Sequence, residues 1–171
     1  MFKLLTLSLV VALCALNING EHAKSCAAVA QGYEYYGLNN GCLILVEERL
    51  TWPHAAYECY RRFNGRLAQV QSSQQLYAIN GWLNGVYKPI PVYPPEPAGD
   101  WWWVWLESDD LKLIHDRKST RSNTIWLDGE PDNVGGNEHC GNLWNSGRGF
   151  AVADGRCEAQ YSFICETSAS Y

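Results

Sequence analysis

The chain has 171 residues, and its 18 acidic side chains outnumber its 13 Lys and Arg, which gives a formal net charge of −5 at pH 7. This acidic balance disfavours nucleic acid as a partner, because a phosphate-binding face needs clustered Lys and Arg. The small basic cluster at Arg117, Lys118 and Arg121 is interpreted as a solvated loop.

Residues 1–20 have the composition of a secretory signal peptide. Lys3 precedes a nearly apolar run from Leu4 to Leu16, which has about the length of a signal and is too short to span a bilayer. A retained membrane anchor is the alternative. No later stretch is long and apolar enough to cross a membrane. We therefore expect a secreted, extracellular protein without membrane insertion, with residues 21–171 forming one domain.

Six cysteines follow the predicted signal, and an even number in an exported chain indicates three disulfides. Spacing alone does not choose among the possible pairings. A zinc site would need close C-x-x-C pairs, which this sequence lacks. The six residues are Cys26, Cys42, Cys59, Cys140, Cys157 and Cys165.

The first predicted elements are a hairpin and a helix. The turn signal at residues 39–41 leads into an apolar strand over 42–46. In residues 51–65 apolar side chains recur at helical spacing, with Thr51 as the N-cap and Gly65 as the stop. Cys59 would lie on the apolar face of this helix, so its disulfide should tether the helix to the core.

A short strand over residues 66–72 and a second helix follow. Ser73 is the predicted N-cap of this helix and Gly85 its stop. Gly81 interrupts it at a cost of about 1 kcal/mol. The side chains expected to point inward are Leu76, Ile79 and Leu83.

Residues 88–100 hold five of the chain's prolines and predict an extended surface insertion, with a linker between two domains as the alternative. The tryptophan-rich strand at 101–110 could stack sugars or single-stranded bases, but core packing is favoured, because alternate strand positions face the core. One or two of Trp101, Trp102 and Trp105 should still be partly exposed. Three short strand-like runs in the loop-rich remainder complete an α+β domain.

The segment 129–144, GEPDNVGGNEHCGNLW, is the candidate metal site. Glu130, Asp132, Glu138 and Asp154 are hard oxygen donors of the kind that calcium binds. Brought together without a cation they would repel one another and their pKa values would rise. Pro131 allows a cis peptide that would turn oxygens inward. A merely solvated acidic loop is the alternative.

The chain resembles the C-type lectin-like domain family from about Cys26 to Glu166. The features that carry this resemblance are LTWPHAAYEC…GRLAQV, WVWL, IWLDGEPDNVGGNEHCGNLW and VADGRC…FIC, in the family's order. The resemblance implies a double-looped fold of helices and small antiparallel sheets whose long loop region carries a calcium and ligand site. It also implies the long-form disulfide pairs Cys26–Cys42, Cys59–Cys165 and Cys140–Cys157.

Sugar-binding members of this family have a Glu-Pro-Asn or Gln-Pro-Asp triplet, a glutamate six residues later and a Trp-Asn-Asp triplet. Residues 130–132 (Glu-Pro-Asp), Glu138 and residues 152–154 (Val-Ala-Asp) occupy these positions here. The resemblance therefore implies that Glu130, Asp132, Glu138 and Asp154 bind both calcium and the ligand. The family's auxiliary calcium site does not carry over, because only Asp109 of its ligand positions matches.

Two amide donors that sugar-binding members direct at the sugar are missing. Asp132 accepts only when ionised, and Ala153 offers no polar atom. Each such hydrogen bond contributes about 0.5–1.5 kcal/mol, so losing both would weaken monosaccharide binding by about ten- to a hundredfold. Candidate replacement donors are Asn133, Asn137 and Asn142.

The resemblance predicts a calcium-dependent lectin that recognises glycans on microbes or on self surfaces, as in innate immunity. Mannose-, fucose- or glucose-like ligands are favoured over galactose, and a homo-oligomer would offset weak binding per domain. One alternative is a protein of the same fold that binds a protein or mineral surface, with calcium but without strong sugar binding. An enzyme with Glu130 and Glu138 as an acid–base pair is disfavoured, because their placement matches ligand positions.

Overall fold

The structure is a computed structural model that describes residues 26–38, 41–70, 72–86, 101–104, 125–145 and 149–168. The predicted signal peptide, the proline-rich insertion, Trp105 and the basic cluster lie outside these residues. Among the described residues, none of the helices has the length and apolar character that crossing a bilayer requires.

The strands form one seven-stranded sheet. In chain order they are β1 (Tyr35–Leu38), β2 (Gly41–Leu50), β3 (Arg66–Leu67), β4 (Trp101–Trp103), β5 (Cys140–Asn145), β6 (Phe150–Gly155) and β7 (Tyr161–Ser168). Their spatial order is β1-β2-β7-β4-β5-β6, and β3 also pairs with β7. All of these pairs are antiparallel except β4 with β7. The small antiparallel sheets that were predicted are thus joined into one, because β7 pairs with both β2 and β4.

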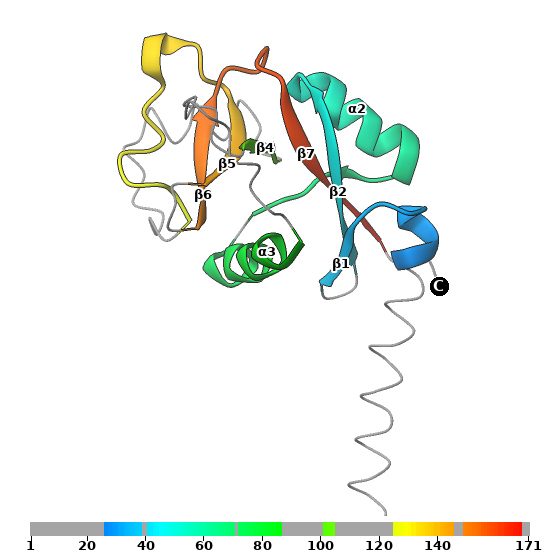
Figure 1. Cartoon of the computed structure of the whole chain (residues 1–171). Coiled ribbons are helices and arrows are strands. Elements are labelled where there is room, and N and C mark those ends of the chain that lie inside the picture. The colour runs from blue at the N-terminus through cyan, green and yellow to red at the C-terminus, as the bar shows by residue number, and fades with distance from the viewer. Residues whose placement is uncertain are drawn as a thin grey trace, which may run out of the picture.

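Two main helices lie on opposite sides of this sheet, α2 (Trp52–Phe63) and α3 (Ser73–Val86). Figure 1 shows α2 beside β2 and β7, and α3 on the other side of the central strands. Both helices were predicted. A further short helical segment at residues 26–30 precedes the hairpin of β1 and β2.

The C-terminus of α2 and both ends of α3 differ by one residue from the positions that the sequence suggested. The left-handed residue that closes α2 is Asn64, with φ 48°, and not Gly65. The α3 cap is Ser72 and not Ser73, because the Gln75 N–H donates to the Ser72 hydroxyl at 3.2 Å. The predicted stop at Gly85 is also wrong, since α3 runs on to Val86.

Gly65 is required for a different reason, the close approach of β7. A Cβ atom at this position would lie 2.4 Å from the carbonyl oxygen of Glu166, well inside van der Waals contact. The space that a side chain would fill is therefore taken by the backbone of β7, and the left-handed turn falls to Asn64, whose short polar side chain tolerates that conformation.

Both faces of β2 are buried. Leu43 and Leu45 join a core that includes Leu76, Ile79 and Leu83 of α3, as predicted for that helix. Ile44 and Val46 join a second core that includes Ala55, Cys59 and Phe63 of α2. Successive side chains of a strand point to opposite faces, which explains why the sequence over 42–46 is continuously apolar.

Three disulfides tie these elements together, and they are the pairs that the family resemblance implies. Cys26–Cys42 joins the first helical segment to β2, Cys59–Cys165 joins α2 to β7, and Cys140–Cys157 joins β5 to the chain just after β6. The Cys59–Cys165 bridge spans 106 residues and in the chain-entropy model stabilises the fold by about 4–5 kcal/mol.

The tryptophan-rich strand packs into the molecule, as expected. Trp102 and Trp103 are buried, whereas Trp101 is only half-buried. The Trp101 ring stacks on Trp144 and Tyr161 at centroid distances of 5.2 and 5.3 Å. The tryptophans of β4 thus link β5 to β7 across both faces of the sheet.

A pair of glycine substitutions tests this account of packing. Gly65→Ala should lower stability by about 1–3 kcal/mol, because the added methyl group meets the backbone of β7. Gly81→Ala should raise it by about 0.5–1 kcal/mol, because Gly81 lies in α3 with open space around its Cα. Thermal unfolding of the two variants beside the parent measures both effects, and a shift of the same sign in both would contradict the packing described.

Candidate metal and ligand site

The acidic loop begins against the outer edge of β6. Trp126 forms a parallel bridge with Val152, and the Leu127 N–H donates to the Val152 carbonyl at 2.9 Å. The Glu130 N–H then donates back to the Leu127 carbonyl at 2.9 Å, closing a tight turn. These backbone hydrogen bonds therefore position Glu130 beside the end of β6.

The loop then reverses over residues 130–136. The Glu130–Pro131 peptide is cis, the conformation that Pro131 allows. Asn133, Gly135 and Gly136 all have positive φ, and Val134–Gly136 form a single turn of 3-10 helix, η1. Asparagine and glycine are the residues that adopt this conformation at least cost, which accounts for the Asn-Val-Gly-Gly run.

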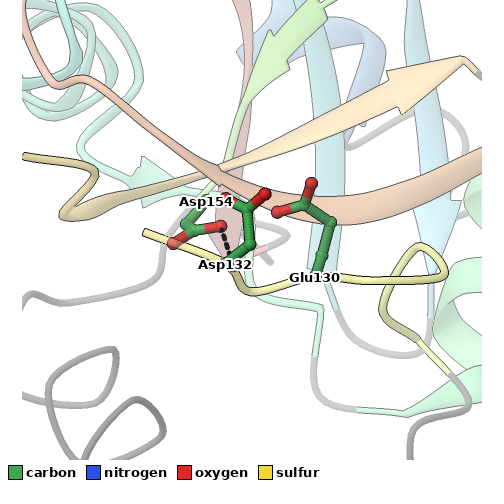
Figure 2. A group of neighbouring side chains, drawn as sticks. All are labelled: Glu130, Asp132 and Asp154. Atoms are coloured by element: carbon green, nitrogen blue, oxygen red, sulfur yellow. Dashed lines mark hydrogen bonds between the residues drawn. The ribbon is translucent and has the colours of Figure 1, made fainter. Parts of the chain in front are cut away.

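Asp154, at the end of β6, anchors this reversal. Its Oδ1 accepts the Asp132 N–H at 3.1 Å and its Oδ2 accepts the Asn133 N–H at 3.0 Å. Figure 2 shows the first of these bonds. The Asp154 side chain is buried, with 5% of its surface exposed. Both of its oxygens thus hold the loop on the strand.

Three carboxylates converge at this point. Glu130, Asp132 and Asp154 each offer an oxygen, and these oxygens lie within 4.8 Å of one another. In Figure 2 the three side chains lie next to one another, two from the loop and one from β6. Calcium–oxygen distances are about 2.3–2.6 Å, so oxygens that share one calcium ion are at most about 5 Å apart. The observed spacing is compatible with one ion between the three.

Glu138, the fourth predicted residue, lies beside this group and not inside it. Its carboxylate accepts the Val134 N–H at 2.8 Å, and the same N–H lies 3.2 Å from Asp132 Oδ1. The Glu138 N–H in turn donates to the Asn133 side-chain oxygen at 3.0 Å. The carboxylates of Glu138 and Asp132 are therefore held on the same backbone N–H, that of Val134.

Burial, together with the crowding of like charges, raises the pKa values of Glu130 and Glu138. Burial first, then a hydrogen bond with Asp154 and the charges of its acidic neighbours, raises the pKa of Glu130 to about 8. Burial also raises the pKa of Glu138, helped by the charges of Asp154 and Asp132. The protein by itself therefore does not satisfy these carboxylates as anions.

The donor set fits calcium. Among the described residues Glu130 Oε2 is buried without a hydrogen-bond partner, and a buried acceptor of this kind requires a partner from outside. All the side chains involved are oxygen donors, and calcium takes 6–8 such ligands. Zinc, in contrast, favours nitrogen and sulfur ligands. The assignment of these residues as calcium ligands stays a prediction at this point.

Asn133 has a role that the sequence reasoning did not foresee. We considered it as a donor to a ligand, but its side-chain oxygen binds the Glu138 N–H, and its backbone N–H binds Asp154. Its position before two glycines, where asparagine commonly forms local side-chain bonds in turns, is the signal that could have indicated this. Asn137 is exposed, and Asn142 is fully buried in β5.

Comparison with known proteins decides the family. Residues 48–167 match the Lectin C-type domain. The chain belongs to the C-type lectin family. As the resemblance implied, its helices, sheet and three disulfides are those of an α+β C-type lectin-like fold.

The chain covers very different shares of its relatives in this family. It is 30% identical over 145 residues to the human protein C-type lectin domain family 4 member K, covering 81% of this chain and 38% of that protein. It is 28% identical over 169 residues to a C-type lectin mannose-binding isoform from Oxyuranus scutellatus, covering 96% of each. Among solved structures, human lithostathine shares the fold, with a TM-score of 0.59 at 19% identity, over 78% of this chain and 96% of that one. The chain thus spans under half of its human relative.

The raised pKa of Glu130 predicts that the calcium-free protein becomes less stable as the pH rises. Its folded-state pKa, about 8, lies above its ordinary value of 4.5. Between these values the folded protein holds a proton that the unfolded chain has lost, so the stabilisation is complete below about pH 4.5 and disappears as the pH rises through about 8.

Thermal unfolding in excess chelator, followed from about pH 5 to about pH 9, measures this dependence. The parent should lose more stability over that range than Glu130→Gln, which has no proton to lose at that position. Parallel curves for the two proteins would show that Glu130 does not titrate between its folded and unfolded states as described.

Proposed function

We propose that this protein is a secreted calcium-dependent lectin that binds glycans through its acidic loop. The observation that carries the proposal is the convergence of Glu130, Asp132 and Asp154 oxygens within 4.8 Å, at the positions where sugar-binding members of the family have calcium ligands. Calcium bound there would supply coordination positions that two vicinal sugar hydroxyls can fill.

The chain's own residues would share the remaining work. Asp154 is rigid, because it is buried and bonded to two loop amides, so it would fix the ion relative to the fold. Glu130 and Glu138 flank the group and have carboxylate oxygens suited to accept hydrogen bonds from ligand hydroxyls. Asp132 would add negative charge toward the ion but, when ionised, donates nothing to the sugar.

Mannose-, fucose- or glucose-like sugars are the ligands we propose. Glu130 at the first triplet position follows the mannose-type pattern of the family, whereas Asp132 at the third follows the galactose-type pattern. The residue two positions after Asp132 is Val134, which is 64% exposed, so an aliphatic group and not an aromatic ring stands where a galactose-type site would stack the sugar. The relative from Oxyuranus scutellatus is named for mannose binding, which agrees with this choice.

Secretion and a binding role complete the proposal. Three disulfides within about 140 residues are typical of chains that fold in an oxidising compartment. A purely catalytic use of the two glutamates is disfavoured, because the Glu138 carboxylate is engaged with the Val134 N–H. Weak binding per domain would favour presentation of several copies, such as a homo-oligomer.

The second candidate function is binding to a protein or mineral surface, with calcium but without strong sugar binding. The observation that favours it is the absence of both family amide donors. Position 132 is an aspartate, and position 153 is an alanine that is 2% exposed. A glycan array that stays blank while calorimetry detects calcium binding would select this candidate.

Removal of calcium gives the first test. The purified protein should bind a mannose column in the presence of calcium and elute when a chelator is added, because the ligand hydroxyls would lose the ion that coordinates them. Asp154→Ala should fail to bind under either condition. Retention that is unaffected by the chelator would be incompatible with the lectin mechanism.

Asp132→Asn gives a second test with two opposed readouts. The amide restores one hydrogen-bond donor, so mannose affinity should rise by about two- to tenfold, equivalent to 0.5–1.5 kcal/mol. Calcium affinity should fall, because one negative charge leaves the site. Calorimetry with calcium, followed by sugar competition on a mannose column, measures both. A fall in both affinities would mean that Asp132 is not placed to face the sugar.

A further inference from the structure

Asn142, in the middle of β5, is a fully buried amide with no use in the fold as described. Its side chain is 0% exposed, and among the described residues neither its Nδ2 nor its Oδ1 has a hydrogen-bond partner. Buried side-chain amides are nearly always paired, and one that is not asks for a partner supplied from elsewhere. The question is what that partner is.

The register of the sheet places Asn142 directly opposite Ala153. Residues that face each other on antiparallel strands project from the same side of the sheet, with Cβ atoms about 4.5–5.5 Å apart. Ala153 is the residue before Asp154 and the position from which related sugar-binding proteins direct an amide at the site. A side chain at Asn142 can therefore enter the space that the short side chain of Ala153 leaves.

The amide also lies close to Gly155, the residue that follows Asp154. Its Nδ2 lies 2.7 Å from the point where a Cβ atom of Gly155 would stand. Gly155 pairs with Cys140, two residues closer than Asn142 to Glu138. The Asn142 amide thus lies against the backbone of β6 directly after Asp154, and it can do so because Gly155 has no side chain.

The site lacks what such an amide supplies. The loop N–H groups of Asp132, Asn133, Val134 and Glu138 are already engaged, so they offer no further donors. Glu130 Oε2 is a second buried atom without a partner. An amide contributes two donor hydrogens and one oxygen, which suits both a carboxylate and an oxygen-seeking cation.

We propose that Asn142 is a positioning residue of the ion site, supplying from β5 the side-chain amide that Ala153 of β6 does not. This inference rests on the proposed function, because it assigns Asn142 to the same ion. The amide orients the carboxylate set and adds an oxygen at its base; it does not contact a sugar, since it is fully buried.

Asn142→Leu tests the proposal, because leucine has the same branched arrangement of side-chain heavy atoms and no polar atom. Calorimetry should show calcium affinity reduced by about tenfold or more, while the melting temperature in chelator stays unchanged or rises as a buried unpaired amide is removed. Ala153→Asn added to Asn142→Leu should recover calcium affinity, because it returns an amide to the same space. Asn145→Ala, at the end of the same strand, is the matched control and should bind calcium as the parent does.

Three outcomes would overturn the inference. Calcium affinity of Asn142→Leu equal to that of the parent would place Asn142 outside the site. Lost affinity with a lower melting temperature in chelator and no recovery by Ala153→Asn would assign it to the fold alone. If the parent itself takes up no calcium, the proposed function fails first and the inference fails with it, so the two failures are distinguishable.

Discussion

The carboxylate of Asp154 is the interaction on which the acidic loop depends. It accepts N–H groups from the consecutive residues Asp132 and Asn133. Two such bonds fix both the position and the rotation of the loop backbone. The direction in which the Asp132 side chain leaves the loop is thereby set from β6.

This arrangement gathers like charges that would separate if the loop were free. Three acidic oxygens lie within 4.8 Å of one another, and the pKa of Glu130 is raised to about 8. The free-energy cost of bringing these carboxylates together is offset by the disulfide and the packed sheet around them. Cys140–Cys157 closes the ends of β5 and β6, and the sheet behind them is covered on both faces by the cores of α2 and α3. Strongly perturbed carboxylates in such a rigid setting are typical of functional sites.

With Asn142 in its proposed role, the site chemistry of the family would be divided differently between the strands of this chain. The strand β6 keeps the aspartate but has alanine before it, whereas β5 places an amide directly across from that alanine. Residues that face each other on neighbouring strands occupy one space, so a functional group can move from one strand to the other without leaving the site. Gly155 leaves room for the Asn142 amide, because any side chain there would meet it.

The sequence by itself determined those features that depend on local pattern. The apolar run at 42–46 predicted a buried strand, and the helical spacing in residues 51–65 predicted α2. The placement of Glu130, Asp132, Glu138 and Asp154 predicted that four acids meet, and three of them do, with Glu138 beside them. The family motifs implied the disulfide pairs. Each of these signals lies within a short stretch or in a motif with a fixed order, so no knowledge of distant contacts was needed.

Tertiary structure alone decided the rest, because it depends on which distant segments lie side by side. Gly65 looked like a helix stop, but it is glycine because Glu166 of β7 approaches it. The predicted separate sheets are one sheet because β4 pairs with β7 in parallel. These strands are far apart in the sequence, so no local pattern indicates that they pair. From the sequence, Ala153 indicated the loss of an amide that sugar-binding members of the family have. Only the register of β5 against β6 shows that Asn142 lies opposite Ala153. Chain order says which groups are present; pairing of the strands says which of them share a space.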